Sequence, residues 1–364
     1  MRLVSLRLRN IGVFENTTVP LADGIASGSD AEDATDTRTP RPVTVLFGAD
    51  GIGKTTLLTA LAVTRPGYAL PPTPYPRGAG APPPDGPAFV VTEWFLGGDD
   101  PERPHPLVVA SPAAVFEGET VDAAGARRRE QALFDRRAQG EGGFVFVGFS
   151  GARWFSRTAN MLSMPDRSIL RYDVRSAASF DDPTRADLAR ETKQVLAYAA
   201  IAEALGGGRA EYGHLARLAT AVREVVDVLL QPFGFTYAGV SPTTLEPEAT
   251  DRSGRVVGFD ALPRAARHLV AFGALSLRAL FAAYPTARNP RDGEGVVAID
   301  DIESQQDPAL LRAVILLLRR ALPNVQWILT TSSMQLAMAC APGEVVALRK
   351  DEGARIEVND GILH

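Results

Sequence analysis

The spacing of hydrophobic residues along the chain changes from region to region. Between Leu3 and Phe14 apolar residues alternate with basic and polar ones, which predicts one or two half-buried strands. Two continuous apolar runs, at 43–47 and 296–299, predict strands that are buried on both faces. Residues 54–63 are mostly apolar and predict a helix that follows the first of these runs.

Strands and helices alternate over much of the chain. Further strands are predicted at 88–95, 106–109 and 144–147, and further helices at 184–204, 210–230 and 262–284. After these we expect a strand, a helix, a strand, a helix and a final hairpin, at 296–299, 307–322, 325–331, 333–341 and 344–363. Alternation of this kind predicts an α/β fold with a mostly parallel sheet that helices cover on both faces.

Composition shifts divide the chain into three predicted domains. Residues 1–155 would form an N-terminal lobe with an antiparallel β subdomain and two insertion loops, a polar one at 22–42 and a proline- and glycine-rich one at 66–87. We interpret the second loop as a surface excursion or as a ligand for a partner protein. Residues 156–258 would form a helical insertion, too short for a long coiled-coil arm. Residues 259–364 would form a C-terminal lobe.

Bulk composition excludes few functions. The 364 residues are 45% hydrophobic with a net charge of −5, which gives no overall reason to bind nucleic acid. The one visible basic stripe, Arg127–Arg129 with Arg136 and Arg137, would either contact nucleic acid locally or form a solvated helix face, and the interspersed acidic residues favour the second. Cys340 is the single cysteine, so the chain can form neither an internal disulfide nor a cysteine-based zinc site. Without a signal peptide or a membrane-spanning run, we expect a cytoplasmic protein.

The segment GADGIGKT at 48–55 fits the phosphate-loop pattern G-x-x-x-x-G-K-[ST] at every fixed position. It lies between a predicted buried strand and a predicted helix, where backbone N–H groups and the helix dipole can hold phosphate. Lys54 would reach the β and γ phosphates of a nucleotide, and the Thr55 hydroxyl would bind Mg²⁺. The residues expected to contact the nucleotide here are Gly48, Asp50, Gly51, Ile52, Gly53, Lys54, Thr55 and Thr56.

A second acidic element follows the apolar run at 296–299. Asp300 and Asp301 stand directly after this strand, where a nucleotide site needs carboxylates. Asp300 would complete the Mg²⁺ site with Thr55. Asp301 would polarise the attacking water, so that Asp301 and Lys54 are the expected catalytic residues.

With these motifs the chain resembles ABC-type ATPases of the RecF/SMC-like branch, especially compact ATP-binding proteins often found in bacterial anti-phage systems. The matching segments are LVSLRLRNIGVFENTTVPL (3–21), FGADGIGKTTLL (47–58), GFSGARWF (148–155), GVVAIDDIESQQDP (295–308) and PNVQWILTTSSMQL (323–336). The resemblance implies a P-loop NTPase fold, ATP and Mg²⁺ as cofactors, and association through bound ATP. It also suggests adenine stacking near Arg9 or Phe14.

The chain departs from the family pattern at each element that serves hydrolysis. Asp50 replaces an asparagine, and Asp301 replaces a glutamate whose carboxylate would reach about 1.5 Å further. Ser332 stands at the position of the histidine that senses the γ-phosphate, and the signature motif L-S-x-G-[EQ] aligns with LPRAA at 262–266. There Pro263 lacks the hydroxyl and Ala265 blocks close backbone approach. Arg264, Arg267 and His268 either substitute as cationic groups or form a solvated helix start.

These departures predict slow turnover or turnover that depends on a partner. We expect an ATP-dependent switch or assembly subunit, as in an anti-phage complex whose effector is a separate polypeptide. The expected association is a homo-oligomer, an ATP-dependent dimer or higher, or a heteromer with the effector. Two alternatives stay open: an ATP-binding scaffold without hydrolysis, and a RecF-like DNA repair clamp, which the acidic composition disfavours.

Overall fold

The computed structural model describes residues 1–24, 38–75, 84–96, 106–141 (135–141 as backbone only), 144–159, 187–206, 212–284, 286–352 and 355–362. Parts of the loops predicted at 22–42 and 66–87, the side chains of Arg136 and Arg137, and much of 156–186 therefore lie outside the described residues. The chain divides into two compact units, Met1–Phe144 with Gln326–His364, and Val145–Val325. These boundaries differ from the three domains predicted, because the C-terminal strands pair with an N-terminal strand.

The first unit contains the predicted antiparallel subdomain. Its four strands lie in the order β2-β1-β8-β9 and pair antiparallel throughout. Their bounds are β1 (Arg2–Ile11), β2 (Phe14–Pro20), β8 (Phe89–Phe95) and β9 (Leu107–Ala110). In β1 the residues Arg2, Ser5, Arg7 and Arg9 are half-buried while most of their neighbours are buried, as the alternation predicts.

The first unit also contains a group of parallel strands. β5 (Val43–Phe47) lies between β15 (Val325–Thr331) and β16 (Val345–Lys350) and is parallel to both. β17 (Ile356–Asp360) closes the predicted C-terminal hairpin by pairing antiparallel with β16. Every residue of β15 is buried, including the polar Gln326, Thr330 and Thr331.

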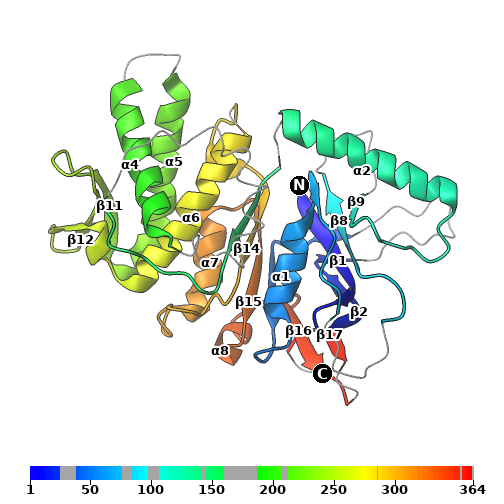
Figure 1. Cartoon of the computed structure of the whole chain (residues 1–364). Coiled ribbons are helices and arrows are strands. Elements are labelled where there is room, and N and C mark those ends of the chain that lie inside the picture. Colours follow the sequence, from blue (N-terminus) through cyan, green and yellow to red (C-terminus); the bar gives the residue numbers. More distant parts are fainter. Residues whose placement is uncertain are drawn as a thin grey trace. The chain divides into compact units, whose positions relative to one another are not determined.

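Helices and short hairpins complete this unit (Figure 1). α1 (Lys54–Val63) packs against β1 and β8, α2 (Val121–Glu141) against β9, and α8 (Met334–Ala337) against β5. Two short strand pairs, which the sequence does not predict, lie in the first insertion loop and at the start of the second. They pair β3 (Ala22–Asp23) with β4 (Thr39–Pro40), and β6 (Thr64–Arg65) with β7 (Tyr68–Ala69).

The second unit combines a parallel strand pair with a group of helices. β10 (Phe146–Phe149) is parallel to β14 (Gly295–Ile299), all of whose residues are buried. α5 packs against three other helices, and α4, α5 and α6 lie side by side in Figure 1. The helices are α4 (Ala189–Gly206), α5 (Gly213–Leu230), α6 (Arg264–Ala283) and α7 (Leu311–Ala321), with short 3₁₀ turns at Gln231–Phe233, Phe259–Ala261 and Pro290–Asp292.

The predicted helical insertion is wrong for its last part. A three-stranded antiparallel sheet follows α5, made of β11 (Phe235–Val240), β12 (Pro247–Asp251) and β13 (Val256–Gly258). Gly234, at φ 76°, ends the helical segment in the left-handed conformation that a change of direction requires. Helices α4 and α5 then pack against β11 and cover this small sheet.

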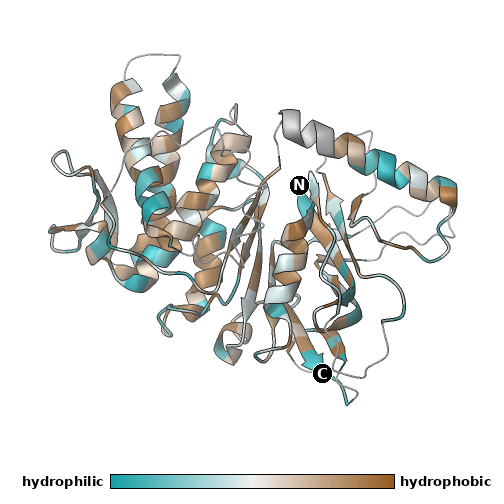
Figure 2. Ribbon diagram, in the orientation of Figure 1, coloured by the Kyte–Doolittle hydropathy of each residue, from teal (hydrophilic) through white to brown (hydrophobic). Residues whose placement is uncertain are grey.

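α6 is the central helix of the second unit. Its 20 residues are long and apolar enough to cross a membrane by length and composition, but 72% of its apolar window is buried inside the fold. A Cβ on Gly273 would lie 2.5 Å from Leu229 and 2.7 Å from Val225 of α5, so the two helices approach closely there. In Figure 2 strand β14 is brown, and therefore apolar, whereas the helices carry both apolar and polar residues. We therefore identify α6 as a buried core helix.

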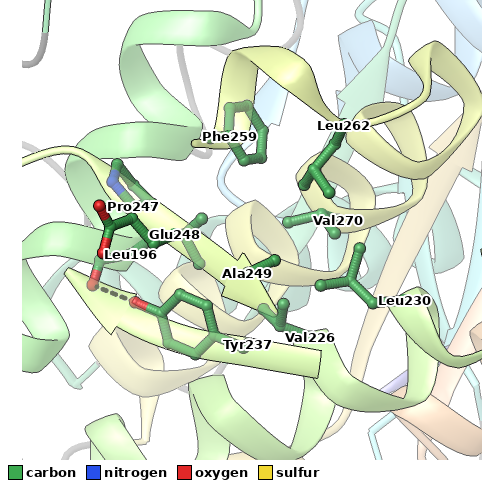
Figure 3. Close-up of a pocket in the computed structure, with 10 residues that line it drawn as sticks. All are labelled: Leu196, Val226, Leu230, Tyr237, Pro247, Glu248, Ala249, Phe259, Leu262 and Val270. Atoms are coloured by element: carbon green, nitrogen blue, oxygen red, sulfur yellow. Dashed lines mark hydrogen bonds between the residues drawn. The ribbon is translucent and has the colours of Figure 1, made fainter. Parts of the chain in front are cut away.

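A small cavity lies where α4, α5 and α6 meet β11 and β12 (Figure 3). Its volume is about 10 Å³, and apolar side chains such as Val226, Leu262 and Val270 line most of it. The Tyr237 hydroxyl points to the Leu196 carbonyl and donates a hydrogen bond to it (3.1 Å). A space of this size holds at most one water molecule, so the cavity is a small packing gap in the core and not a ligand pocket.

Candidate nucleotide site

The phosphate loop has the strand-loop-helix geometry that the sequence predicts. It leaves β5 after Phe47 and enters α1 at Lys54, with the bounds of both elements as expected. Gly51 and Gly53 have φ values of 75° and 97°, which side chains rarely adopt. The Gly48 amide donates to the Thr331 carbonyl (3.2 Å), which fixes the start of the loop against β15.

The Lys54 ammonium group lies over this loop. It donates to the carbonyls of Gly48 (2.7 Å) and Ala49 (2.9 Å). The Asp50 carboxylate is 3.8 Å from the Lys54 nitrogen and its side chain is 96% exposed. The phosphate loop therefore carries the Lys54 ammonium, several backbone amides and the exposed Asp50 carboxylate within a few residues.

The turn between β1 and β2 packs beneath the phosphate loop. A Cβ on Gly53 would lie 2.6 Å from Val13 Cγ2 and 2.7 Å from Phe14 Cε2, and one on Gly12 would lie 2.7 Å from Thr56 Cγ2. Phe14 is fully buried, so the adenine stacking that was expected near Arg9 or Phe14 cannot use the Phe14 ring. Arg9 donates to the Asp85 carbonyl (2.9 Å).

The other predicted nucleotide contacts in this unit differ in exposure. Thr55 is exposed, Thr56 is half-buried, and the Ile52 side chain is buried, which leaves only its backbone to face a ligand. Ser332 is exposed and follows the last residue of β15, whose Thr331 pairs with Phe47 of β5. Because β15 and β5 are parallel, Ser332 and the phosphate loop stand at the same edge of these strands.

In the second unit, β14 ends at the predicted carboxylates. Asp300 is only 8% exposed, and Asp301 adopts a left-handed conformation with φ 49°. Burial and the neighbouring Glu303 carboxylate raise the pKa of Asp301, while Arg153 acts in the opposite direction.

Arg153 holds the backbone of this acidic loop, residues 300–305. Its guanidinium, 1% exposed, donates to the carbonyls of Asp300 (2.6 Å) and Asp301 (2.8 Å). Longer bonds reach three more carbonyls, those of Ser150 (3.0 Å), Ser304 (3.2 Å) and Ile302 (3.4 Å). Burial lowers the pKa of Arg153 to about 10, and the carboxylates of the loop oppose this shift, so the group stays charged at neutral pH.

The segment at 262–266 begins a helix, as predicted. Pro263 is the residue before α6, which starts at Arg264. Leu262, Ala265 and Ala266 are buried, so only Pro263 and Arg264 of the LPRAA segment are exposed.

Lys193 of α4 anchors the approach to this helix. Its buried ammonium group contacts the carboxylates of Asp260 (2.7 Å) and Glu246 (3.1 Å). It also donates to the Thr158 carbonyl (3.0 Å). Lys193 therefore ties three segments together just ahead of the LPRAA segment.

His268 cannot serve as the cationic substitute that the sequence allowed. It is fully buried, and burial lowers its pKa to about 4, so the ring is neutral at pH 7. Its Nδ1 lies 2.9 Å from the Arg264 carbonyl, and its ring packs edge-on against Phe155. Arg267 is half-buried and lies 5.3 Å from the centre of the same Phe155 ring.

Solved structures resemble this architecture over its whole length. The SMC head bound to the C-terminal winged-helix domain of ScpA is 14% identical, with a TM-score of 0.53 over 99% of this chain and 98% of that one. The fold is that of an SMC head. The SMC head of Thermotoga maritima covers 100% of both chains (14% identity, TM-score 0.49), and that of Pyrococcus furiosus covers 99% and 96% (13% identity, TM-score 0.45).

No protein-family model matches the chain. At this level of identity the likeness concerns the SMC head fold alone. It confirms the SMC-like part of the predicted resemblance as a statement about architecture.

The structure groups the predicted site residues into two sets. The first unit brings Ser332 to the edge that carries the phosphate loop, and the second unit holds Asp300, Asp301 and the LPRAA segment. The sequence assigned no role to Arg153, Glu303 or Lys193. Arg153 lies in the segment GFSGARWF, which matches the family pattern. Its guanidinium donates to backbone carbonyls, and a contact of this kind cannot be recognised in a sequence.

Proposed function

We propose that this chain binds Mg²⁺ and ATP, with ATP phosphates on the phosphate loop. The observation that carries the proposal is the geometry at 48–55: two glycines at positive φ, a helix N-terminus, and the Lys54 ammonium held over the loop. These are the groups that a polyphosphate requires. Thr55 and Asp300 are the proposed Mg²⁺ ligands, and an exposed hydroxyl and a nearly buried carboxylate suit a hard cation.

Hydrolysis is proposed to be slow or dependent on a partner. Asp301 is the proposed base that accepts a proton from water. Its pKa is raised towards neutral pH, which favours proton transfer. Against this stand the shorter side chain, Ser332 in place of an imidazole, and a LPRAA segment that is largely buried. Each missing group in a phosphoryl-transfer site costs on the order of 10²-fold in rate.

Nucleotide binding would then act as a switch for assembly. We propose an ATP-dependent dimer, a higher homo-oligomer, or a heteromer with a separate effector in an anti-phage defence complex. Support comes from the SMC head fold and from the structure with that fold that is bound to a domain of ScpA. Sedimentation with and without Mg·ATP tests this part: an unchanged oligomeric state would refute the ATP-dependent assembly.

Binding and hydrolysis are tested with three variants. ATP affinity, measured by calorimetry, should fall by at least about 10-fold in Lys54→Ala, because one charge-assisted contact to phosphate is lost. Arg129→Ala, an exposed cation on α2, which packs against β9 and not against the phosphate loop, is the control and should bind as the wild type does. Equal affinity in Lys54→Ala and the wild type would refute the nucleotide site.

Turnover is measured on the same proteins together with Asp301→Asn. The proposal expects a slow wild-type rate that Asp301→Asn lowers further by about 10²-fold or more. If wild type, Lys54→Ala and Asp301→Asn all equal the background rate while ATP still binds, the chain is a scaffold that holds ATP without hydrolysing it.

A further inference from the structure

We infer that Arg153 is a positioning residue that sets the place of the Asp300 carboxylate by clamping the backbone of the acidic loop. The inference rests on the proposed nucleotide function and adds a residue to it. Arg153 donates to the backbone carbonyls of Asp300 and Asp301, so we assign it a role that acts through these two residues and do not class it as a catalytic residue.

The clamp is built from both ends of the arginine. The guanidinium donates to four carbonyls of the acidic loop, of residues 300, 301, 302 and 304. In the opposite direction, the Gln305 side-chain amide donates to the Arg153 carbonyl (2.7 Å). The planar guanidinium of an arginine can donate to several acceptors at once in a fixed geometry. A lysine ammonium on its flexible side chain cannot hold several acceptors in a fixed geometry.

The loop needs such a clamp because its backbone is strained. Asp301 and Gln305 both have positive φ, 49° and 64°, and neither is a glycine. Inside the loop the Ser304 amide donates to the Asp301 carbonyl (2.9 Å), the same oxygen that accepts from Arg153. Loss of the guanidinium would therefore release the turn that follows the carboxylates.

Space around the carboxylates is also limited on the side of Arg153. A Cβ on Gly151 would lie 3.2 Å from Asp301 Cβ and 3.4 Å from Asp300 Oδ2. The segment 150–153 thus holds the loop from two sides, with its glycine against the side chains and its arginine on the carbonyls. The buried Phe272 ring of α6 lies 5.1 Å from Arg153 Cζ and packs against the guanidinium.

The first test needs no nucleotide. Hydrogen exchange of the Ser304 amide is compared among wild type, Arg153→Met and Arg153→Lys. Arg291→Met is the matched control, because Arg291 also clamps two carbonyls of the second unit, those of Arg320 and Ala321. We expect faster exchange at Ser304 in both Arg153 variants and not in the control. Unchanged exchange at Ser304 would overturn the inference.

The second test separates the Mg²⁺ half of the site from the phosphate half. ATP affinity is measured with excess Mg²⁺ and with a chelator, and the ratio gives the tightening due to Mg²⁺. Arg153→Met should reduce this tightening by about 10- to 100-fold, as loss of a group that orients a metal ligand does. Arg153→Lys should lose less, since it keeps the charge but not the planar guanidinium. Affinity without Mg²⁺ should stay within about two-fold of the wild type.

The outcomes distinguish this inference from the proposed function. A folded Arg153 variant with full Mg²⁺ tightening would overturn the positioning role, and so would an equal loss in Arg291→Met, which would indicate general destabilisation. A wild type without Mg²⁺ tightening would overturn it too. A wild type that binds no ATP at all refutes the proposed function, and the exchange measurement then decides on the clamp alone.

Discussion

Two glycine substitutions in the phosphate loop test how that loop is supported. Gly51→Ala and Gly53→Ala both place a methyl group on a residue with positive φ, at 75° and 97°. They differ in surroundings: among the described residues, no atom lies within 4 Å of the new methyl at Gly51, whereas at Gly53 it would meet Val13 and Phe14 at 2.6 and 2.7 Å. The pair thus separates backbone strain from packing against the β1–β2 turn.

The expected magnitudes follow from these two contributions. Left-handed backbone costs an alanine about 1–2 kcal/mol, and this applies to both variants. Crowding in a packed region costs about 1–3 kcal/mol more, and this applies to Gly53→Ala alone. We therefore expect the free energy of unfolding to fall by about 1–3 kcal/mol more in Gly53→Ala than in Gly51→Ala.

Urea unfolding followed by circular dichroism measures this difference. In a double-mutant cycle, Val13→Ala should restore part of the stability lost in Gly53→Ala, because it removes the nearest atom, and should restore none in Gly51→Ala. Equal losses in the two single variants, within about 0.5 kcal/mol, would refute the packing of the turn beneath the loop.

Two further predictions concern charge. The pKa of His268 is about 4 in the folded chain and 6.5 in the unfolded chain, so the unfolded state binds more protons between these two pH values. The contribution of His268 to the free energy of unfolding is therefore fully present above pH 6.5. It falls by about 3 kcal/mol as the pH drops to 4. His268→Gln should remove that part of the acid sensitivity in unfolding curves at pH 7 and pH 4; an unchanged dependence would contradict it. Asp50→Asn should tighten ATP binding about two- to five-fold, since the exposed carboxylate beside Lys54 repels phosphate; calorimetry that shows equal or weaker binding would contradict this.

The local pattern of apolar and polar residues was enough to predict the elements around the phosphate loop. The predicted bounds of β5, α1 and β15 agree with the structure, because a buried strand and a helix that packs behind it each leave a continuous local signal. The three-stranded sheet β11–β13 leaves no such signal. Its strands have three to six residues and their burial depends on α4 and α5, so a sequence reading assigned the region to helices.

The candidate site divides in the same way. Local sequence sufficed for the phosphate loop and for the carboxylates after β14, since each motif lies within a dozen residues and its chemistry resides in its own side chains. It also suggested cationic substitutes near the LPRAA segment, and it could not show that His268 is buried and neutral.

Local sequence therefore specifies the pair of motifs, their side chains and the strands that carry them. The folded structure shows in addition that the C-terminal strands join the N-terminal unit and that the β1–β2 turn packs against Gly53. It alone placed the Arg153 guanidinium on a carbonyl 147 residues further along the chain. The reason is physical: a backbone carbonyl is the same in every residue, so a contact to it is specified by folding and not by residue type.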